Sequence, residues 1–135
     1  GAASSEAAST DTAASVPDGG EDNIIRVGVV CSMTGGSAIY GEGAQNAVDM
    51  AVEEINAGDS GYKIEIVNGG KVADDAKDAK QAMNAYNKVM ADSPEAIVGS
   101  FFLSVTLPMA EQASKDGMLL ATGATNADVT LKGDL

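Results

Sequence analysis

The chain has 135 residues, enough for one domain or less, and a formal net charge of -12 from 8 basic and 20 acidic side chains. This acidic balance argues against a nucleic-acid partner, and the absence of histidine excludes the catalytic triads that depend on it. The single cysteine, Cys31, permits no internal disulfide and no cysteine-based metal site, and we expect it to be a small buried hydrophobe.

Residues 1–23 consist mostly of Ala, Ser, Thr, Gly and acids, with no Lys or Arg. Such a segment cannot bury enough apolar surface to offset its ordering entropy, so we expect it to be disordered. Two interpretations stay open: a flexible linker, and a tether of the kind that follows the lipid-bearing cysteine of bacterial lipoproteins. In the second interpretation that cysteine lies outside this chain, and a signal peptide has been removed.

Strand and helix patterns alternate from Ile24 onward. Residues 24–30 form a β-branched run that is typical of a strand buried on both faces. A helix should begin near Gly41, with Glu42 in its first turn, and end at the stop signal 56–58. Its apolar stripe recurs at helical spacing: Ala44, Ala47, Val48, Ala51, Val52 and Ile55.

Residues 62–67 alternate polar and apolar, which predicts a half-exposed strand, and a loop follows at 68–71. A second helix should start at Asp74 or Asp75 and carry a second apolar stripe: Ala76, Ala79, Met83, Tyr86 and Met90. The charges around its start have the pattern of a solvated helix end rather than of a calcium loop: Asp74, Asp75, Lys77, Asp78 and Lys80.

The remaining pattern predicts a strand at 96–99, a helix from about Leu107 to Asp116 and a strand at 118–121. Pro108 suits the first turn of that helix, and Gly117 suits its end. Strands that alternate with helices imply right-handed crossovers and a parallel sheet. We therefore predict an α/β fold, a three-layer sandwich around a parallel sheet of strand order 2-1-3-4.

The loops after the strands should share one rim of the sheet, where such folds bind ligands: 32–40, 68–73, 100–106 and 122–126. Three of them are rich in Ser, Thr and Gly, whose hydroxyl and N–H groups suit a carboxylate or phosphate. Tyr40, in the loop before the first helix, either covers an apolar ligand or staples the loop to the helix. Phe101, Phe102 and Leu103 fit either the core or a ligand wall.

These residues form no catalytic constellation. No nucleophile lies beside a general base, nothing matches a Walker loop, and the glycines of 41–46 lie too far from the strand end for a dinucleotide fingerprint. We expect no enzyme activity, no cofactor and no metal site. A flavodoxin-like module, with residues 32–37 cradling a flavin phosphate, is an alternative, although the expected helix begins several residues beyond that cradle.

Residues 26–56 run from a strand through a Thr-Gly turn and Tyr-Gly to a helix ending in Glu-Glu-Ile-Asn. This order resembles the opening of the leucine/isoleucine/valine-type solute-binding proteins of ABC importers. Individually weak similarities follow at 96–100, 105–110, 120–126 and 131–134. The resemblance implies a type I periplasmic-binding-protein fold, with residues 24–135 as an incomplete lobe 1. Because such proteins are more than twice as long, we expect a fragment, or an association that covers the missing surface.

In this family, the loops after the third and fourth strands hold the ligand's carboxylate and ammonium groups. Carried over to this chain, the resemblance implies that Thr125 offers its hydroxyl and amide, and Gly123 its carbonyl. Ala124 lies between them in the same Ala-Thr ligand loop. Tyr40 matches the family's loop tyrosine, which packs near the ligand.

Two loops depart from the family pattern. The Ser-Ser pair after the third strand is replaced by Phe102 and Leu103, with Ser104 one place later. This change removes the hydroxyl expected on the ligand carboxylate and puts an ordinary α-amino acid ligand in question. The acidic loop after the second strand is replaced by residues 68–73, with an apparent insertion.

The resemblance implies a non-enzymatic substrate-binding component of an ABC transporter, for a branched-chain amino acid or a similar small solute. It would close around the solute by a hinge motion. Its partners would be that solute and the ABC permease, with membrane contact only through a lipid tether upstream of the chain. It would act outside the cytoplasmic membrane, in the periplasm or at the cell surface. The ligand-binding lobe of a sensory receptor is a further alternative.

Overall fold

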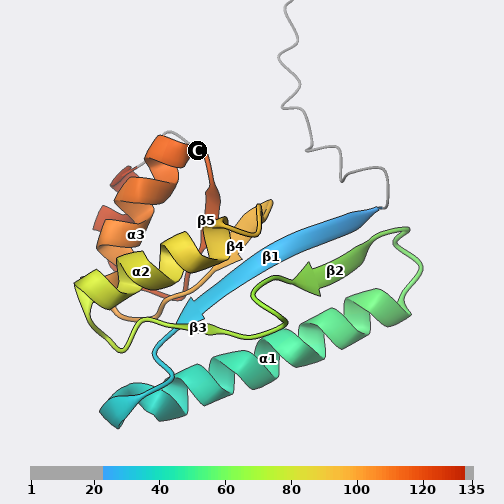
Figure 1. Ribbon diagram of the computed structural model, residues 1–135, viewed down its shortest axis with the longest axis horizontal. Helices are drawn as coiled ribbons and strands as arrows, with labels where there is room; N and C mark the ends of the chain where they lie inside the picture. The colour runs from blue at the N-terminus through green and yellow to red at the C-terminus, as the bar shows by residue number, and fades with distance from the viewer. Residues whose placement is uncertain (1–22, 133–135) are drawn as a thin grey trace, which may run out of the picture.

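The strand β1 (Ile24–Cys31) lies in the middle of the fold in the computed structural model, which describes residues 23–132 (Figure 1). Its carboxyl-terminal half is buried, but residues 24–27 are partly exposed, so the prediction of full burial over residues 24–30 holds only for residues 28–30. The expected disordered tether falls outside the described residues, apart from Asn23.

The sheet has the predicted strand order. Every pairing is parallel, and the order is β2-β1-β4-β5, with β2 at Lys63–Ile66, β4 at Ala96–Val98 and β5 at Leu119–Ala121. A two-residue strand, β3 (Ala73–Asp74), pairs with β1 beyond the end of β2. The sequence did not predict β3 because two residues are too few to show a periodicity.

Helices cover both faces of the sheet (Figure 1). One face carries α1 (Ala38–Ala57), and the other carries α2 (Ala79–Met90) and α3 (Leu103–Asp116). Side chains alternate along β1, so Val30 packs against α2 and α3, while Val29 and Cys31 face α1. The predicted three-layer sandwich is confirmed. Two 3-10 turns, η1 (Gly35–Ser37) and η2 (Ala127–Lys132), flank the helical layers.

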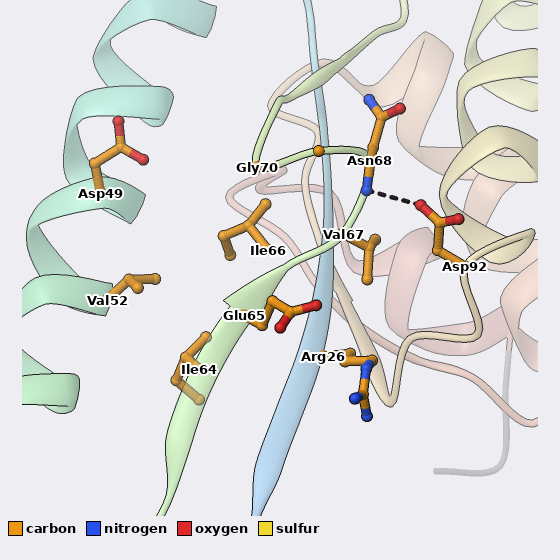
Figure 2. Close-up of a pocket in the computed structure, with 11 residues that line it drawn as sticks. Arg26, Asp49, Val52, Ile64, Glu65, Ile66, Val67, Asn68, Gly70 and Asp92 are labelled. Carbon is orange, nitrogen blue, oxygen red and sulfur yellow. Dashed lines mark hydrogen bonds between the residues drawn. The ribbon is translucent and has the colours of Figure 1, made fainter.

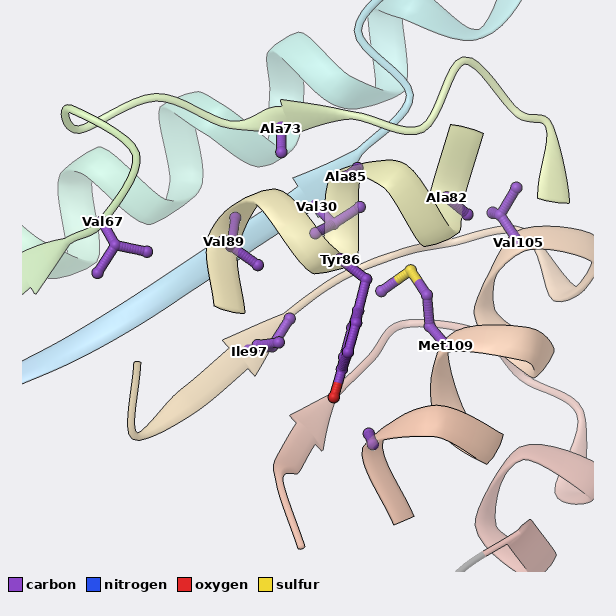
Figure 3. Close-up of a cluster of buried hydrophobic side chains, with 11 residues drawn as sticks. Val30, Val67, Ala73, Ala82, Ala85, Tyr86, Val89, Ile97, Val105 and Met109 are labelled. Carbon is purple, nitrogen blue, oxygen red and sulfur yellow. The ribbon is translucent and has the colours of Figure 1, made fainter. Parts of the chain in front are cut away.

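The main hydrophobic core lies between the sheet and the pair α2 and α3 (Figure 3). Its largest members have no exposed surface: Val30, Tyr86, Val89, Ile97, Val105 and Met109. The Tyr86 hydroxyl donates to Asp116 at 2.7 Å, so the polar end of this buried ring is satisfied. The α1 side of the sheet is more open, because only Gly41 and Ala44 of that helix are buried.

The start of α1 differs from the prediction. The helix begins at Ala38 rather than near Gly41, so Tyr40 lies in its first turn and not in a loop, and Glu42 lies in the second turn. Gly41 is a packing residue: a Cβ there would stand 2.1 Å from the Ser32 carbonyl oxygen. The glycine therefore marks close contact between helix and strand end, rather than the start of the helix.

The start of α3 also differs. The helix begins at Leu103 rather than near Leu107, which leaves Pro108 inside it. Proline cannot donate a hydrogen bond to the Ser104 carbonyl, but Ser104 is exposed, so water can reach that group. Gly117 ends the helix with φ 64, in the left-handed region, as predicted.

Asp78 begins α2, and the prediction of Asp74 or Asp75 is wrong. The Asp78 carboxylate accepts a hydrogen bond from the Gln81 amide at 2.9 Å, which satisfies a free N–H of the first turn. Each of the three aspartates could cap a helix by residue type. Tertiary contacts decide between them, because Asp74 and Asp75 bond to the loop after β1.

Candidate functional site

The carboxyl ends of β1, β3, β4 and β5 meet along one edge of the sheet, here called the rim. Residues 32–37, 75–78, 99–102 and 122–126 follow these strands. The loop after β2 does not join the rim, although the sequence predicted it. The strand β2 ends opposite Val27, and β1 continues beyond that point to pair with β3. The loop after β2 therefore begins several residues short of the end of β1.

Asp75 is a buried carboxylate that fastens two rim loops together. It has no exposed surface, and one oxygen accepts from the Ser32 hydroxyl at 2.5 Å and from the Lys77 amide at 2.8 Å. Its own amide donates to the Cys31 carbonyl at 3.1 Å. The prediction of a solvated helix start is therefore wrong for Asp75. The side chain positions the loops after β1 and β3 relative to each other.

Asp74 makes a second set of contacts to the loop after β1. Its carboxylate accepts from the Met33 amide at 2.8 Å and from the Thr34 hydroxyl at 2.7 Å. Burial acts to raise the pKa of Asp74. The hydrogen bonds from Thr34, Met33 and Ala76 outweigh that effect and hold the pKa below its usual value. Asp74 thus serves the rim as a charged acceptor while it stays partly exposed to solvent.

Tyr40, Lys77 and Phe102 come together at the rim and are here called the rim cluster. The Tyr40 and Phe102 rings meet edge to face, with centroids 5.6 Å apart and planes at 90°. The Lys77 Nζ atom lies 4.4 Å from the centre of the Phe102 ring. Three segments that are distant in sequence therefore present an aromatic surface and a cation side by side. Tyr40 and Phe102 were predicted site residues, whereas Lys77 was interpreted as a surface charge.

The first turn of α3 places Leu103 and Ser104 next to the rim cluster. Phe102 is the N-cap residue and supplies no side-chain cap. The amides of Val105 and Thr106 both bond to the Phe102 carbonyl, so those of Leu103 and Ser104 have no partner within the helix. Leu103 and Ser104 are exposed. An uncapped helix start of this kind favours negative charge in its neighbourhood.

The predicted ligand loop after β5 lies beside the loop after β4. The Thr122 hydroxyl donates to the Ser100 carbonyl at 2.5 Å and accepts from the Ala124 amide at 3.0 Å. Gly123 and Thr125 are exposed. Thr122 thus fixes the loop that carries Gly123, Ala124 and Thr125. The sequence placed Thr122 in this loop but gave no sign of its role, because its partner is 22 residues away.

Phe101 separates from Phe102 and belongs to an apolar hollow. It is 42% exposed, and its ring covers Gly123, where a Cβ would stand 2.6 Å from the ring. The hollow, of about 260 Å³, lies between α1 and the ends of β4 and β5. It is lined by apolar residues that include Val29, Cys31, Ala44, Val48 and Val98. Phe102 instead packs partly against the main core, so the two aromatics have different surroundings.

Cys31 is the small buried hydrophobe that the sequence predicted. It is 1% exposed, and burial, followed by the charge of Asp75, raises the pKa of its thiol to about 12. At neutral pH the thiol is protonated, which makes it a poor nucleophile. In the described part of the chain, no group of three His, Cys, Asp or Glu side chains could hold a metal ion.

A larger hollow, of about 680 Å³, lies away from the rim, along the edge strand β2 (Figure 2). Its lining includes Asp49 and Val52 of α1 and Ile66 of β2, which lie on the α1 side of the strand, whereas Glu65 points to the opposite side, toward Arg26 (Figure 2). It contains none of the predicted site residues. Among residues 23–132 there is also no helix of the length and apolar character needed to span a bilayer.

Comparison with known proteins gives one family. The family model described as "Periplasmic binding protein" matches residues 24–133. The Leu/Ile/Val-binding protein homolog 1 of Brucella abortus is 35% identical over 112 residues, which cover 81% of this chain and 29% of that protein. The chain therefore spans less than a third of that relative's length.

Two solved structures support the same fold. LivJ from Streptococcus pneumoniae, in complex with isoleucine, has a TM-score of 0.71 and 30% identity over 82% of this chain and 32% of its own. The leucine-binding protein LivK from Thermotoga maritima has a TM-score of 0.69 and 26% identity over 78% of this chain and 29% of its own. The matched part of each structure corresponds to part of a lobe.

Proposed function

The chain belongs to the periplasmic binding protein family, and from this premise we propose that it forms part of the solute-binding component of an ABC importer. The observation that carries the proposal is the rim, where polar and aromatic groups converge in the fold that LivJ uses with isoleucine. Because the chain spans less than a third of its relatives' length, the solute and the partners below are also proposals.

The proposed solute is an amino acid or a similar small carboxylic acid. We assign it to the rim, in contact with Tyr40, with the start of α3 and with the loop after β5: Phe102, Leu103, Ser104, Gly123, Ala124 and Thr125. The exposed amides at the start of α3 and the exposed hydroxyls of Ser104 and Thr125 supply donors for a carboxylate. These donors lie next to aromatic rings, which suits an apolar side chain.

The proposed protein acts outside the cytoplasm, binds without catalysis and delivers its solute to an ABC permease. Family membership supports the location and the absence of catalysis. A lipid tether upstream of the chain remains a proposal that rests on the Ala/Ser-rich composition of residues 1–23. The family match replaces the flavodoxin-like alternative, since it covers the strand and helix on which that alternative depended.

Thermal unfolding of the full-length protein against a panel of amino acids, their amides and small carboxylic acids tests the function. A solute that binds the native state raises the unfolding midpoint in a concentration-dependent manner. We expect a selective rise with one class of carboxylate. Cooperative unfolding without a rise for any member of the panel would contradict the proposal.

Thr125→Ala tests the assigned loop. Loss of a hydroxyl that bonds a carboxylate should weaken solute binding by about tenfold, measured by calorimetry. Thr130→Ala is the matched control, because Thr130 is also exposed but its hydroxyl donates within η2, to the Ala127 carbonyl. Equal affinities for the two variants would remove Thr125 from the site.

A further inference from the structure

The ammonium group of Lys77 lies at the rim, over the Phe102 ring. Lys77 is exposed and forms no ion pair within the described part of the chain, whereas Lys132 forms a salt bridge with Glu111. The nearest carboxylates in sequence are already engaged: Asp74 and Asp75 accept bonds from the rim loops, and Asp78 caps α2. Lys77 is thus a cation among acidic neighbours that forms no direct ion pair with a described residue, and its exposed ammonium group can contact an incoming anion.

The backbone at Lys77 is fixed before any ligand arrives. Ala76 and Lys77 adopt φ values of 48 and 54, in the left-handed region that residues with a Cβ rarely adopt. The amide of Ala76 donates to Asp74 at 2.8 Å, and the amide of Lys77 donates to Asp75 at 2.8 Å. The two aspartates therefore set the direction in which the Lys77 side chain leaves the loop.

Aromatic surface lies directly beside this cation. The Lys77 Nζ lies 4.4 Å from the centre of the Phe102 ring, and the Tyr40 ring centre lies 5.6 Å from it in a T-shaped contact. Tyr40 is 58% exposed, so a solute at the rim can reach it. The rim cluster is thus amphipathic: it combines one positive charge with apolar area, and it supplies a charge partner only for an anion.

We propose that Lys77 determines the specificity of the proposed solute site. Its ammonium group binds the solute carboxylate, and Tyr40 and Phe102 pack against the solute's apolar body. This inference rests on the proposed function and narrows it to carboxylates with a branched aliphatic or aromatic body. In such a site, the rim cluster recognises the carboxylate and the apolar body of the solute, and it does not recognise an α-ammonium group.

Calorimetry on the full-length protein with paired acids and amides tests the assignment. The pairs are leucine with leucinamide, isocaproate with its amide and phenylacetate with its amide. The unmodified protein should bind the acid of at least one pair about tenfold more tightly than the amide. Lys77→Met, which keeps the side-chain length, should remove this preference, and Lys77→Arg should keep it. Lys80→Met makes the same charge change three residues away and should leave the preference intact.

Each result decides between the two proposals. An acid preference in Lys77→Met within about twofold of the unmodified protein would overturn the role of Lys77 and leave the solute-binding function standing. Absence of binding for every acid and amide would overturn both. Circular dichroism melts establish that each variant folds. If Lys77→Met does not fold, salt dependence in the unmodified protein decides, because an acid affinity that is insensitive to salt contradicts a lysine–carboxylate contact.

Discussion

Asp75 has no exposed surface, yet it joins the loops that border the proposed site. Removing a carboxylate from water is costly unless hydrogen bonds replace its hydration. The Ser32 hydroxyl and the Lys77 amide supply such bonds to Oδ1, at 2.5 Å and 2.8 Å, whereas Oδ2 is buried without a partner among the described residues. At the residue scale, this one side chain therefore links the stability of the rim to the position of the cation proposed to bind the solute.

Asp75→Ala should destabilise the protein by roughly 2–4 kcal/mol, because the variant leaves the buried Ser32 hydroxyl and the part-buried Lys77 amide without their partner. Urea unfolding measures this change in the free energy of unfolding. Asp59→Ala is the control: Asp59 is exposed in the turn after α1, and its removal should change the free energy by less than about 0.5 kcal/mol. A similar, small effect of both variants would contradict the structural role of Asp75.

At the scale of elements, the contact between α1 and the end of β1 depends on a glycine. Gly41 allows the helix backbone to approach Ser32, where a Cβ would lie 2.1 Å from the carbonyl oxygen. A backbone atom cannot move aside as the end of a flexible side chain can. Tyr40 is the preceding residue, so this contact also positions one wall of the proposed site.

Gly41→Ala and Gly43→Ala should therefore have opposite effects on stability. Alanine at 41 must push α1 away from β1, at a cost of roughly 1–3 kcal/mol. Alanine at 43 meets nothing within 4 Å, so its higher helix propensity should stabilise the protein by up to about 1 kcal/mol. Chemical denaturation of the two variants checks both signs. Stabilisation by Gly41→Ala would show that the contact is not close.

At the scale of the whole molecule, the two faces of the sheet are unequally covered. Eleven buried side chains form the core under α2 and α3, whereas α1 buries only Gly41 and Ala44. The hollow between α1 and the ends of β4 and β5 is lined mainly by apolar groups. Exposed apolar surface of this kind favours association with another surface.

The isolated 135-residue chain should accordingly self-associate as its concentration rises, as measured by sedimentation velocity. Ala47→Glu places a charge in the apolar hollow and should weaken the association. Asn46→Glu adds the same charge at the adjacent exposed position, which does not line the hollow, and should have little effect. A single monomeric species at every concentration would contradict this expectation.

Local pattern was sufficient for much of the fold, whereas the site residues inferred from the sequence stay a prediction. The strands at β1, β2, β4 and β5, the end of α3 at Gly117 and the sheet order were predicted, because each leaves a periodic or turn signal in nearby residues. The starts of α1 and α3 were wrong. Gly41 and Pro108 are residues that often mark helix boundaries. In the structure, Gly41 lies inside α1, where it packs against the end of β1, and Pro108 lies inside α3, one turn after the exposed Ser104.

The sequence by itself determined the class of fold and most of the edge of the sheet on which the loops gather, because strand and helix periodicity is a short-range property. Only the tertiary structure decided which of three similar aspartates is buried, and that Lys77 lies over Phe102. Asp75 bonds to Ser32, which is 43 residues away in the sequence. Lys77 lies over Phe102, which follows a different strand. No local pattern records such a contact, since it depends on how separate strands are paired in the sheet.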